Sequence, residues 1–313
     1  MSSPFLTRRA ALAGAATLPG AAALAGLASP ALAEAHSGAA PAPRHHAFAI
    51  GDFKVSTLLA GTRTVPDPQS IFGMNVPSED FAEVSSQNFL PTDAAQFFFT
   101  PTVVATGDEV VLFDTGTDPD GIRTALAAAG HAPEDITTVV ITHMHGDHIG
   151  GLMAGDAPTF PNAKYVTGQV EYDAWSKMDN DGFKAKVAPL ADRMSFLKDG
   201  DSPLPGITAV SAFGHTPGHM AYHLESGSDR LLLMADTANH YVWSLAYPEW
   251  EVKFDADKAA AAESRKKILG MVAADRIPLV GYHMPFPGLG YVETRGEGGF
   301  HYVPVSYQMM LKG

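Results

Sequence analysis

The sequence predicts an α/β protein in which two mixed β-sheets pack face to face, with helices on the outside. Strand-like runs followed by helical segments occur twice along the chain, an order typical of two βα halves stacked sheet on sheet. The 313 residues are 46% hydrophobic and 18% charged, enough for one large domain or two small ones. No interdomain linker or short internal repeat is found, so we expect a single domain over residues 46–313.

The first 33 residues are predicted to be a signal peptide. Arg8 and Arg9 precede an Ala-, Leu- and Gly-rich stretch that ends in an A-x-A cleavage pattern at residues 31–33. The arginine pair with the following Ala-Ala-Leu resembles a twin-arginine signal. Small residues and Pro19 interrupt the apolar stretch, which argues against a membrane span in the mature chain. We therefore expect a periplasmic or secreted protein.

The composition restricts the partners and the metal chemistry. The formal charge is −13 at pH 7, and removal of residues 1–33, with two arginines and no acidic residue, would make it −15. Nucleic-acid binding draws its affinity from Lys and Arg, so we expect no nucleic-acid partner. The chain has no Cys, so any metal ion must be bound by His and carboxylate side chains.

Residues 34–45 are Ala-, Pro- and Gly-rich and are expected to be a disordered N-terminus of the mature chain. Four prolines and no long periodicity in residues 61–95 predict a loop-rich excursion with one short helix. A Gly at 130 ends the next helix in the C′ position. The strands expected in this half are 47–50, 53–58, 96–106, 110–114 and 137–142, and the helices are 78–84 and 120–129.

In the second half, residues 177–201 form a polar segment without a predicted element. An Ala-rich, alternately charged pattern predicts a long helix over residues 256–274, with Asp255 as its N-cap. The strands expected here are 164–167, 207–213, 220–224, 230–234, 278–282 and 300–305, and the second helix is 169–176.

The stretch Ile-Thr-His-Met-His-Gly-Asp-His at residues 141–148 follows a buried, β-branched strand. In extended backbone His143 and His145 point to the same side. Asp147 and His148 lie where the strand gives way to a turn, so they can reach a second point nearby. Imidazole and carboxylate are the usual ligands of catalytic zinc. The stretch therefore predicts ligands for two metal ions.

Three further candidate ligands each come directly after a strand-like run: His215, Asp236 and His283. Each alone is compatible with an ordinary role as a turn residue, a helix cap or a core-edge histidine. Ligands from the ends of several strands create a site at one edge of a layered fold, where loops can close over a substrate. Their joint appearance after the His cluster is far more specific than any one of them.

These motifs resemble the metallo-β-lactamase-fold superfamily from about residue 46 to the end of the chain. Within it, residues 141–152 resemble the methyl parathion hydrolase group, which lies close to the quorum-quenching lactonases. Residues 160–163, 286–290 and 303–305 resemble that group too. The resemblance implies an αββα sandwich with a binuclear metal site at the sheet edge.

The resemblance implies two divalent metal ions, most simply zinc, although manganese, cobalt and iron accept the same ligands. It places His219 behind the ligands, where it would orient one of them, and Asp114 where it would support the His-containing loop. The implied ligands are His143, His145 and His215 for one ion, Asp147, His148 and His283 for the other, and Asp236 as the bridge.

The implied reaction is hydrolysis by a metal-held hydroxide, with Asp147 and Asp236 as the catalytic carboxylates. We expect a small-molecule substrate: a lactone, an aryl ester or an organophosphate triester. Trp175, Phe183 and Phe286 are expected to line an apolar substrate pocket. The sequence identifies no general acid for an alkoxide leaving group.

Other functions remain open at this stage. A di-iron redox protein of the same fold would usually have Glu at the second cluster position, where this chain has His145, and no flavin domain is present. A metallo-β-lactamase needs a Lys or Arg for the substrate carboxylate, and the sequence identifies none. A non-catalytic binding protein would tend to lose these ligands. The resembling group often forms dimers, and residues 61–101 could supply a homodimer interface.

Overall fold

The computed structural model describes residues 43–296 and 298–306. The expected signal peptide and most of the expected disordered segment lie outside these residues. His45, the last residue of that segment, is the first residue of strand β1, which pairs along its whole length with β2. No helix within the described part combines the length and the apolar composition that a bilayer span requires.

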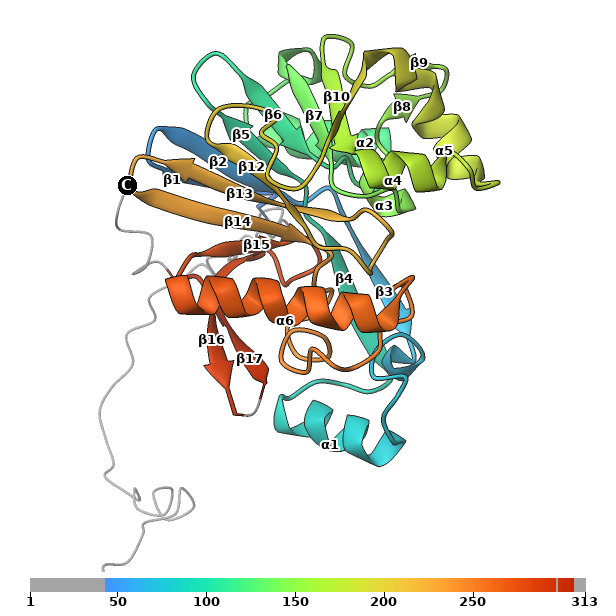
Figure 1. The fold of residues 1–313 in the computed structure, drawn as a ribbon, viewed down its shortest axis with the longest axis vertical. Coiled ribbons are helices and arrows are strands. Elements are labelled where there is room, and N and C mark those ends of the chain that lie inside the picture. Colours follow the sequence, from blue (N-terminus) through green and yellow to red (C-terminus); the bar gives the residue numbers. More distant parts are fainter. Residues whose placement is uncertain (1–42, 297, 307–313) are drawn as a thin grey trace, which may run out of the picture. The chain divides into compact units, whose positions relative to one another are not determined.

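The strands form two large mixed sheets, shown in Figure 1. The first has the order β1-β2-β5-β6-β7-β10-β11, and the second β12-β13-β14-β15-β16-β17. The first comprises β1 (His45–Ile50), β2 (Phe53–Leu58), β5 (Thr102–Ala105), β6 (Val110–Phe113), β7 (Thr138–Ile141), β10 (Lys164–Gly168) and β11 (Met194–Leu197). The second comprises β12 (Ile207–Ser211), β13 (Met220–Ser226), β14 (Asp229–Ala235), β15 (Leu279–Gly281), β16 (Leu289–Arg295) and β17 (Gly299–Pro304).

Alternation along the strands explains why these sheets stack. In β6, Val111 and Phe113 belong to the core between the sheets, while Leu112 belongs to the outer core. In β14, Leu231 and Leu233 face that same inner core, and Leu232 between them faces outward. Successive side chains of a strand point to opposite faces, so each of these strands is apolar on both sides. Both faces of each sheet must therefore be covered.

Helices cover the outer faces. Buried residues of α2 (Pro119–Ala128) pack on the first sheet, and buried residues of α6 (Lys258–Asp275) pack on the second. The layers are thus helix, sheet, sheet, helix, which confirms the predicted αββα sandwich. The remaining helices are α1 (Ser78–Gln87), α3 (Gly146–Ile149), α4 (Gln169–Trp175) and α5 (Asp181–Lys186), with short 3-10 turns at 68–70, 133–135 and 188–193.

The segment from residue 61 to residue 99 contains more regular structure than the sequence predicted. Residues 61–66 form β3, which pairs antiparallel with β4 (Ala94–Phe99) in a separate two-stranded sheet. Helix α1 packs through Phe81 onto Trp243 and Trp250, and the Trp243 indole N–H donates to Ser85 Oγ at 3.0 Å. This aromatic cluster holds the paired strands β3 and β4 against the second half of the chain. We call this pair the β3–β4 hairpin, although a long connection that contains α1 joins its strands.

Several predicted elements differ from the structure. The expected strand 96–106 is two strands, β4 and β5, because the chain leaves one sheet and enters another around Pro101. Residues 61–66 were expected to be loop, since their pairing partner lies about 30 residues away. Helix α5 and strands β11 and β16 were not predicted, and the small two-stranded sheet of β8 (Met153–Ala154) and β9 (Ala157–Pro158) was also not predicted.

We predict that Leu231→Ala lowers the free energy of unfolding by about 2–5 kcal/mol, because it leaves a cavity between the sheets. Leu231 is fully buried in the inner core. Chemical denaturation followed by circular dichroism measures the change. Met178→Ala, at a side chain that is 45% exposed, is the control and should cost under about 0.5 kcal/mol. Equal effects of the two changes would contradict the assignment of this core.

Candidate metal centre

The candidate ligands converge on the edge where several strands end. Asp114 follows β6, His143 follows β7, Asp236 follows β14 and His283 comes two residues after β15. β6 and β7 run parallel, as do β14 and β15, so their carboxyl ends meet at this edge. Asp114 and Ala235 have positive φ angles of 61° and 45°. Such strained backbone at strand ends is typical of functional sites.

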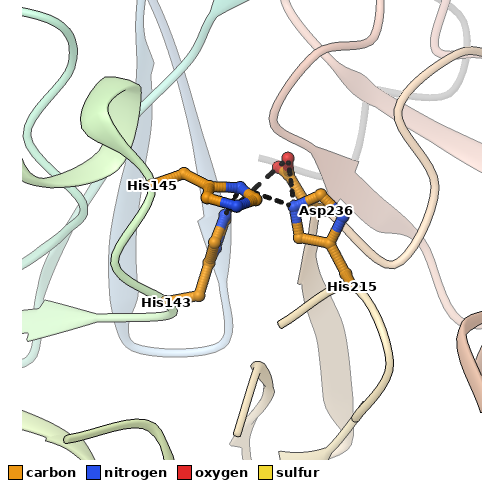
Figure 2. Close-up of side chains that lie close together, drawn as sticks. All are labelled: His143, His145, His215 and Asp236. Carbon is orange, nitrogen blue, oxygen red and sulfur yellow. Dashed lines mark hydrogen bonds and ion pairs between the residues drawn. The ribbon is translucent and has the colours of Figure 1, made fainter. Parts of the chain in front are cut away.

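One group of four side chains brings its ligand atoms within 4.8 Å of one another: His143, His145, His215 and Asp236. Figure 2 shows the three imidazoles and the carboxylate turned toward a common point. His145 Nδ1 lies 3.1 Å from His143 Nε2 and 3.0 Å from His215 Nε2. Asp236 Oδ2 lies 3.2 Å from His215 Nε2.

A second group lies beside the first and consists of Asp147, His148 and His283. Asp147 Oδ2 is 3.3 Å from His283 Nε2 and 3.7 Å from His148 Nε2. Asp236 reaches this group too, because its Oδ1 is 3.2 Å from His148 Nε2 and its Oδ2 is 3.1 Å from His283 Nε2. Asp236 therefore lies between the two groups, where a bridging ligand is expected.

The donor set fits two divalent cations. The Nδ1–H of His215 donates to Asp255, which leaves Nε2 as the ring nitrogen that faces His145 and Asp236. Neutral imidazole lone pairs about 3 Å apart repel one another unless a proton or a cation lies between them. His148 Nε2 and Asp236 Oδ1 are buried and have no hydrogen-bond partner among the described residues. Buried polar atoms without a partner are costly, and a shared cation satisfies both.

The electrostatics of the two groups differ. Burial, together with the neighbouring His215, lowers the pKa of His145 to about 4. Its imidazole is therefore neutral and can bind a metal ion. Burial also acts to lower the pKa of His283, but the Asp236 and Asp147 carboxylates outweigh it and raise the pKa to about 10. A potential negative enough to hold a proton on His283 also attracts a divalent cation.

Asp114 and Tyr282 hold the second group in place. Asp114 accepts from the backbone N–H and the hydroxyl of Thr142, at 2.9 and 2.8 Å. Its Oδ2 also accepts the Nδ1–H of His148 at 2.8 Å, which turns His148 Nε2 toward Asp147 and Asp236. The Tyr282 ring stacks on His148, and its hydroxyl donates to the Asp147 carbonyl at 2.5 Å. The predicted supporting position of Asp114 is thus the one that the structure shows.

Asp255 supports the first group and was misassigned from the sequence. It accepts from His215 Nδ1 at 2.9 Å, and the fully buried Arg265 donates to its Oδ2 through both terminal nitrogens at 3.0 Å. The helix N-cap is instead Asp257, which accepts from the Ala260 N–H. Both aspartates precede the helix, and the sequence pattern does not distinguish the cap from a residue two positions earlier.

Glu171 joins the two histidine-bearing loops, and the sequence did not single it out. Its buried carboxylate accepts from the Met144 N–H at 3.0 Å, and from the Thr216 hydroxyl and the Gly218 N–H at 2.8 Å. Burial raises the pKa of this carboxyl, and the three donors counteract that shift. The sequence has no local signal for this role, because packing decides that the Glu171 side chain is buried.

His219 and Asn239 contact Asp236 from behind. His219 Nε2 accepts the Asp236 backbone N–H at 3.0 Å, and the His219 ring packs on His143. His219 is absent from both groups of converging ligand atoms. The Asn239 amide donates to Asp236 Oδ2 at 2.8 Å, a contact that was not predicted. Asn239 therefore orients the carboxylate of Asp236, and His219 fixes its backbone.

A cavity of about 510 Å³ opens onto the two groups. Trp175 and Phe183 were expected to line it, but they pack in the outer core of the first sheet, because α4 and α5 turn these rings inward. Phe286 is half-buried after β15 and also lies outside the lining. The residues that line the cavity are Arg63, Val65, Phe97, Phe99, Thr117, His145, Gly146, Asp147, Asp236, Phe254 and His283.

The lining includes a cation that the sequence did not reveal. Arg63 lies on β3, 80 residues before His143, and only the pairing of β3 with β4 brings it to the cavity. The sequence identified no Arg or Lys for a substrate carboxylate, and the structure places Arg63 in the cavity lining.

We predict that Asp255→Asn weakens zinc binding about 10- to 100-fold, because His215 loses the carboxylate that orients it. A competitive titration with a chromogenic chelator measures the affinity. Asp257→Asn is the matched control, since Asn also caps helices, and its zinc affinity should match that of the wild type. Equal zinc affinities of the Asp255→Asn and wild-type proteins would contradict the orienting role.

Glu171→Met is expected to lower the free energy of unfolding by about 2–5 kcal/mol, because buried N–H donors on two loops lose their acceptor. Zinc affinity should fall as well, since the two loops carry ligands of the same group. Asp173→Asn changes an exposed carboxylate of the same helix and serves as the control. A variant with wild-type stability and wild-type zinc affinity would rule out this function of Glu171.

Two known proteins are similar in sequence to part of this chain. An N-acyl homoserine lactonase of Bacillus cereus is 28% identical over 165 residues, which are 52% of this chain and 62% of the lactonase. The probable metallo-hydrolase YybB of Bacillus subtilis is 33% identical over 140 residues, 42% of this chain and 57% of YybB. Both alignments therefore cover less than two thirds of the relative's own length.

Two solved structures share the fold. AidC, a dizinc quorum-quenching lactonase in complex with a product, aligns with a TM-score of 0.77 at 24% identity, over 84% of this chain and 98% of AidC. The hydrolase AbOPH of the beta-lactamase superfamily aligns with the same values.

The sequence model of the metallo-beta-lactamase superfamily matches residues 100–283, more than half of the chain. This stretch contains all seven converging ligands, from His143 to His283. The sandwich, the position of the site at its edge and the order of the ligands agree with that match. The protein belongs to the metallo-beta-lactamase superfamily.

Proposed function

We propose that the protein is a metal-dependent hydrolase that opens lactones and cleaves related esters, with two zinc ions bound by the seven converging side chains. The observation that carries this proposal is the convergence of two ligand groups, joined by Asp236, at the base of one cavity. The partial similarity to the Bacillus cereus lactonase supports the same reaction class.

In this proposal the two ions supply Lewis acidity for the scissile carbonyl and an activated water. The chain's residues do the rest. Asp236 lies between the two ligand groups. The Asn239 amide donates to its carboxylate, and His219 accepts its backbone N–H. The rings of Phe97 and Phe99 shield the site from bulk water and favour an apolar substrate body.

Asp147 is well placed to contact a water molecule in the cavity. Its side chain is 27% exposed, and it lines the cavity. The charges of His148 and the contact with His283 overcome burial and lower its pKa to about 2, so it is a carboxylate at neutral pH. We assign to it a hydrogen bond from the attacking water, which orients that water. A carboxyl with so low a pKa is too weak a base to carry a proton on to an alkoxide leaving group.

Aryl esters and organophosphate triesters are further substrates that the proposal includes. Two adjacent cations can polarise a P=O oxygen as well as a C=O oxygen, and the cavity volume of about 510 Å³ is within the usual range for drug-sized ligands. We also propose that the protein is exported, on the strength of the arginine pair and cleavage pattern in residues 1–33. We further propose a homodimer whose interface is formed by residues 61–101.

A substrate panel tests the proposal. The zinc-loaded protein is expected to hydrolyse at least one of an N-acyl homoserine lactone, an aryl ester, a phosphotriester and a β-lactam. Chelation should abolish that turnover and zinc should restore it. Asp236→Asn should lower kcat/KM by at least about 100-fold, because the bridge between the ligand groups is weakened, while circular dichroism shows a retained fold.

Asn239→Asp is a useful companion variant, because it keeps the size of a side chain that contacts Asp236. It adds a second negative charge beside Asp236 but keeps the Asp236 carboxylate itself. Its turnover should therefore fall less than that of Asp236→Asn. Wild-type turnover in Asp236→Asn, or activity that survives complete zinc removal, would contradict the proposed function. Metal analysis showing two irons and a charge-transfer band would favour a redox protein instead.

A further inference from the structure

One wall of the cavity is a single face of the β3–β4 hairpin. Arg63 is paired across the strands with Phe97, and Gly61 with Phe99. Side chains two residues apart on a strand point to the same face, so Arg63 and Val65 share a face with Phe97 and Phe99. All four of these side chains line the cavity. The other face of the hairpin carries the Thr64–Gln96 hydrogen bond.

This wall runs from the metal ligands to solvent. The Phe97 and Phe99 rings meet the His283 ring edge-on, with centroids 5.4 and 5.7 Å away. Phe254, which is 41% exposed, contacts Phe97 from the far side. Arg63 is exposed and lies beside Phe97 on the neighbouring strand. A substrate whose scissile bond lies at the ligands must therefore pass apolar rings before it reaches Arg63.

The Arg63 guanidinium has no competing partner among the residues that the structure describes. No ion pair there involves it, and no hydrogen bond or aromatic stacking contact does either. The other charged members of the lining are Asp147 and Asp236, which belong to the ligand groups, and the histidines. The chain has a formal charge of −13, and Arg63 is the one Lys or Arg among the described residues that line the cavity. Guanidinium groups match carboxylates in geometry and charge.

We propose that Arg63 determines specificity: the site takes esters whose acyl chain ends in a carboxylate, with the apolar chain on Phe97, Phe99 and Phe254 and the carboxylate on Arg63. This inference rests on the proposed hydrolase function and narrows its substrate class. The hairpin lies before residue 100, outside the stretch that matches the superfamily.

The test compares two esters of equal chain length. These are the mono-para-nitrophenyl ester of adipic acid, with a free carboxylate, and para-nitrophenyl hexanoate, which ends in a methyl group. We expect the ratio of kcat/KM for the charged ester to that for the neutral ester to fall about three- to fivefold in Arg63→Met, as for a partly exposed ion pair. Arg63→Lys should retain part of the ratio, and added salt should lower it in the wild type.

Arg123→Met is the control, because this arginine lies on α2, pairs with Asp120 and is absent from the cavity lining. Its ratio should equal that of the wild type. Calorimetry on the zinc-loaded proteins gives a reading that is independent of turnover: adipate should bind more tightly than hexanoate, and Arg63→Met should remove the difference.

The two proposals fail in different ways. If the zinc-loaded protein hydrolyses the neutral ester and Arg63→Met leaves both the ratio and the adipate affinity unchanged, the role of Arg63 is wrong and the hydrolase remains. If neither these esters nor the wider panel is turned over, the hydrolase assignment is wrong. Calorimetry then tests the proposed role of Arg63 separately. Equal binding of adipate and hexanoate by the wild type overturns that role as well.

Discussion

The candidate metal centre depends on the position of one carboxylate, that of Asp236. Asp236 lies between two groups of imidazoles and within 3.2 Å of nitrogens from both. Burial acts to raise the pKa of Asp236, but the charges of His283 and His148 outweigh it and lower the pKa well below the usual value. A buried carboxylate is stable only when it is paired and hydrogen-bonded. The imidazoles of His148, His215 and His283 and the amide of Asn239 together meet that need.

The supports of the site connect it to the rest of the fold. Asp114 ties His148 to the end of β6 in the first sheet, whereas Asp255 and Arg265 tie His215 to α6 on the second. Glu171 joins the loops that bear His143 and His215. Each half of the sandwich contributes ligands, so the site exists only when the two halves are packed. Stability and metal binding are therefore coupled in this protein.

The β3–β4 hairpin serves the site in two ways. The Phe98 carbonyl accepts the Nδ1–H of His283 at 2.9 Å, which turns His283 Nε2 toward Asp236. The neighbouring residues Phe97 and Phe99 form the cavity wall. A change in this hairpin can alter both the orientation of a ligand and the shape of the cavity. Variants of the wall should for this reason be compared at equal zinc occupancy.

The sequence by itself determined the ligands and the layered fold, because both depend on local signals. The spacing from His143 to His148 follows one strand, and His215, Asp236 and His283 each follow another, so neighbouring residues carry the information. Tertiary structure decided what depends on distant pairing. Arg63 reaches the cavity only through the β3–β4 ladder. Trp175 and Phe183, which the sequence assigned to the cavity, face the core because their helices pack that way. Asp255 contacts His215 across 40 residues of sequence. An aromatic, a cation or a carboxylate has the same local signature in a core, at a surface or in a site, and only packing distinguishes among them.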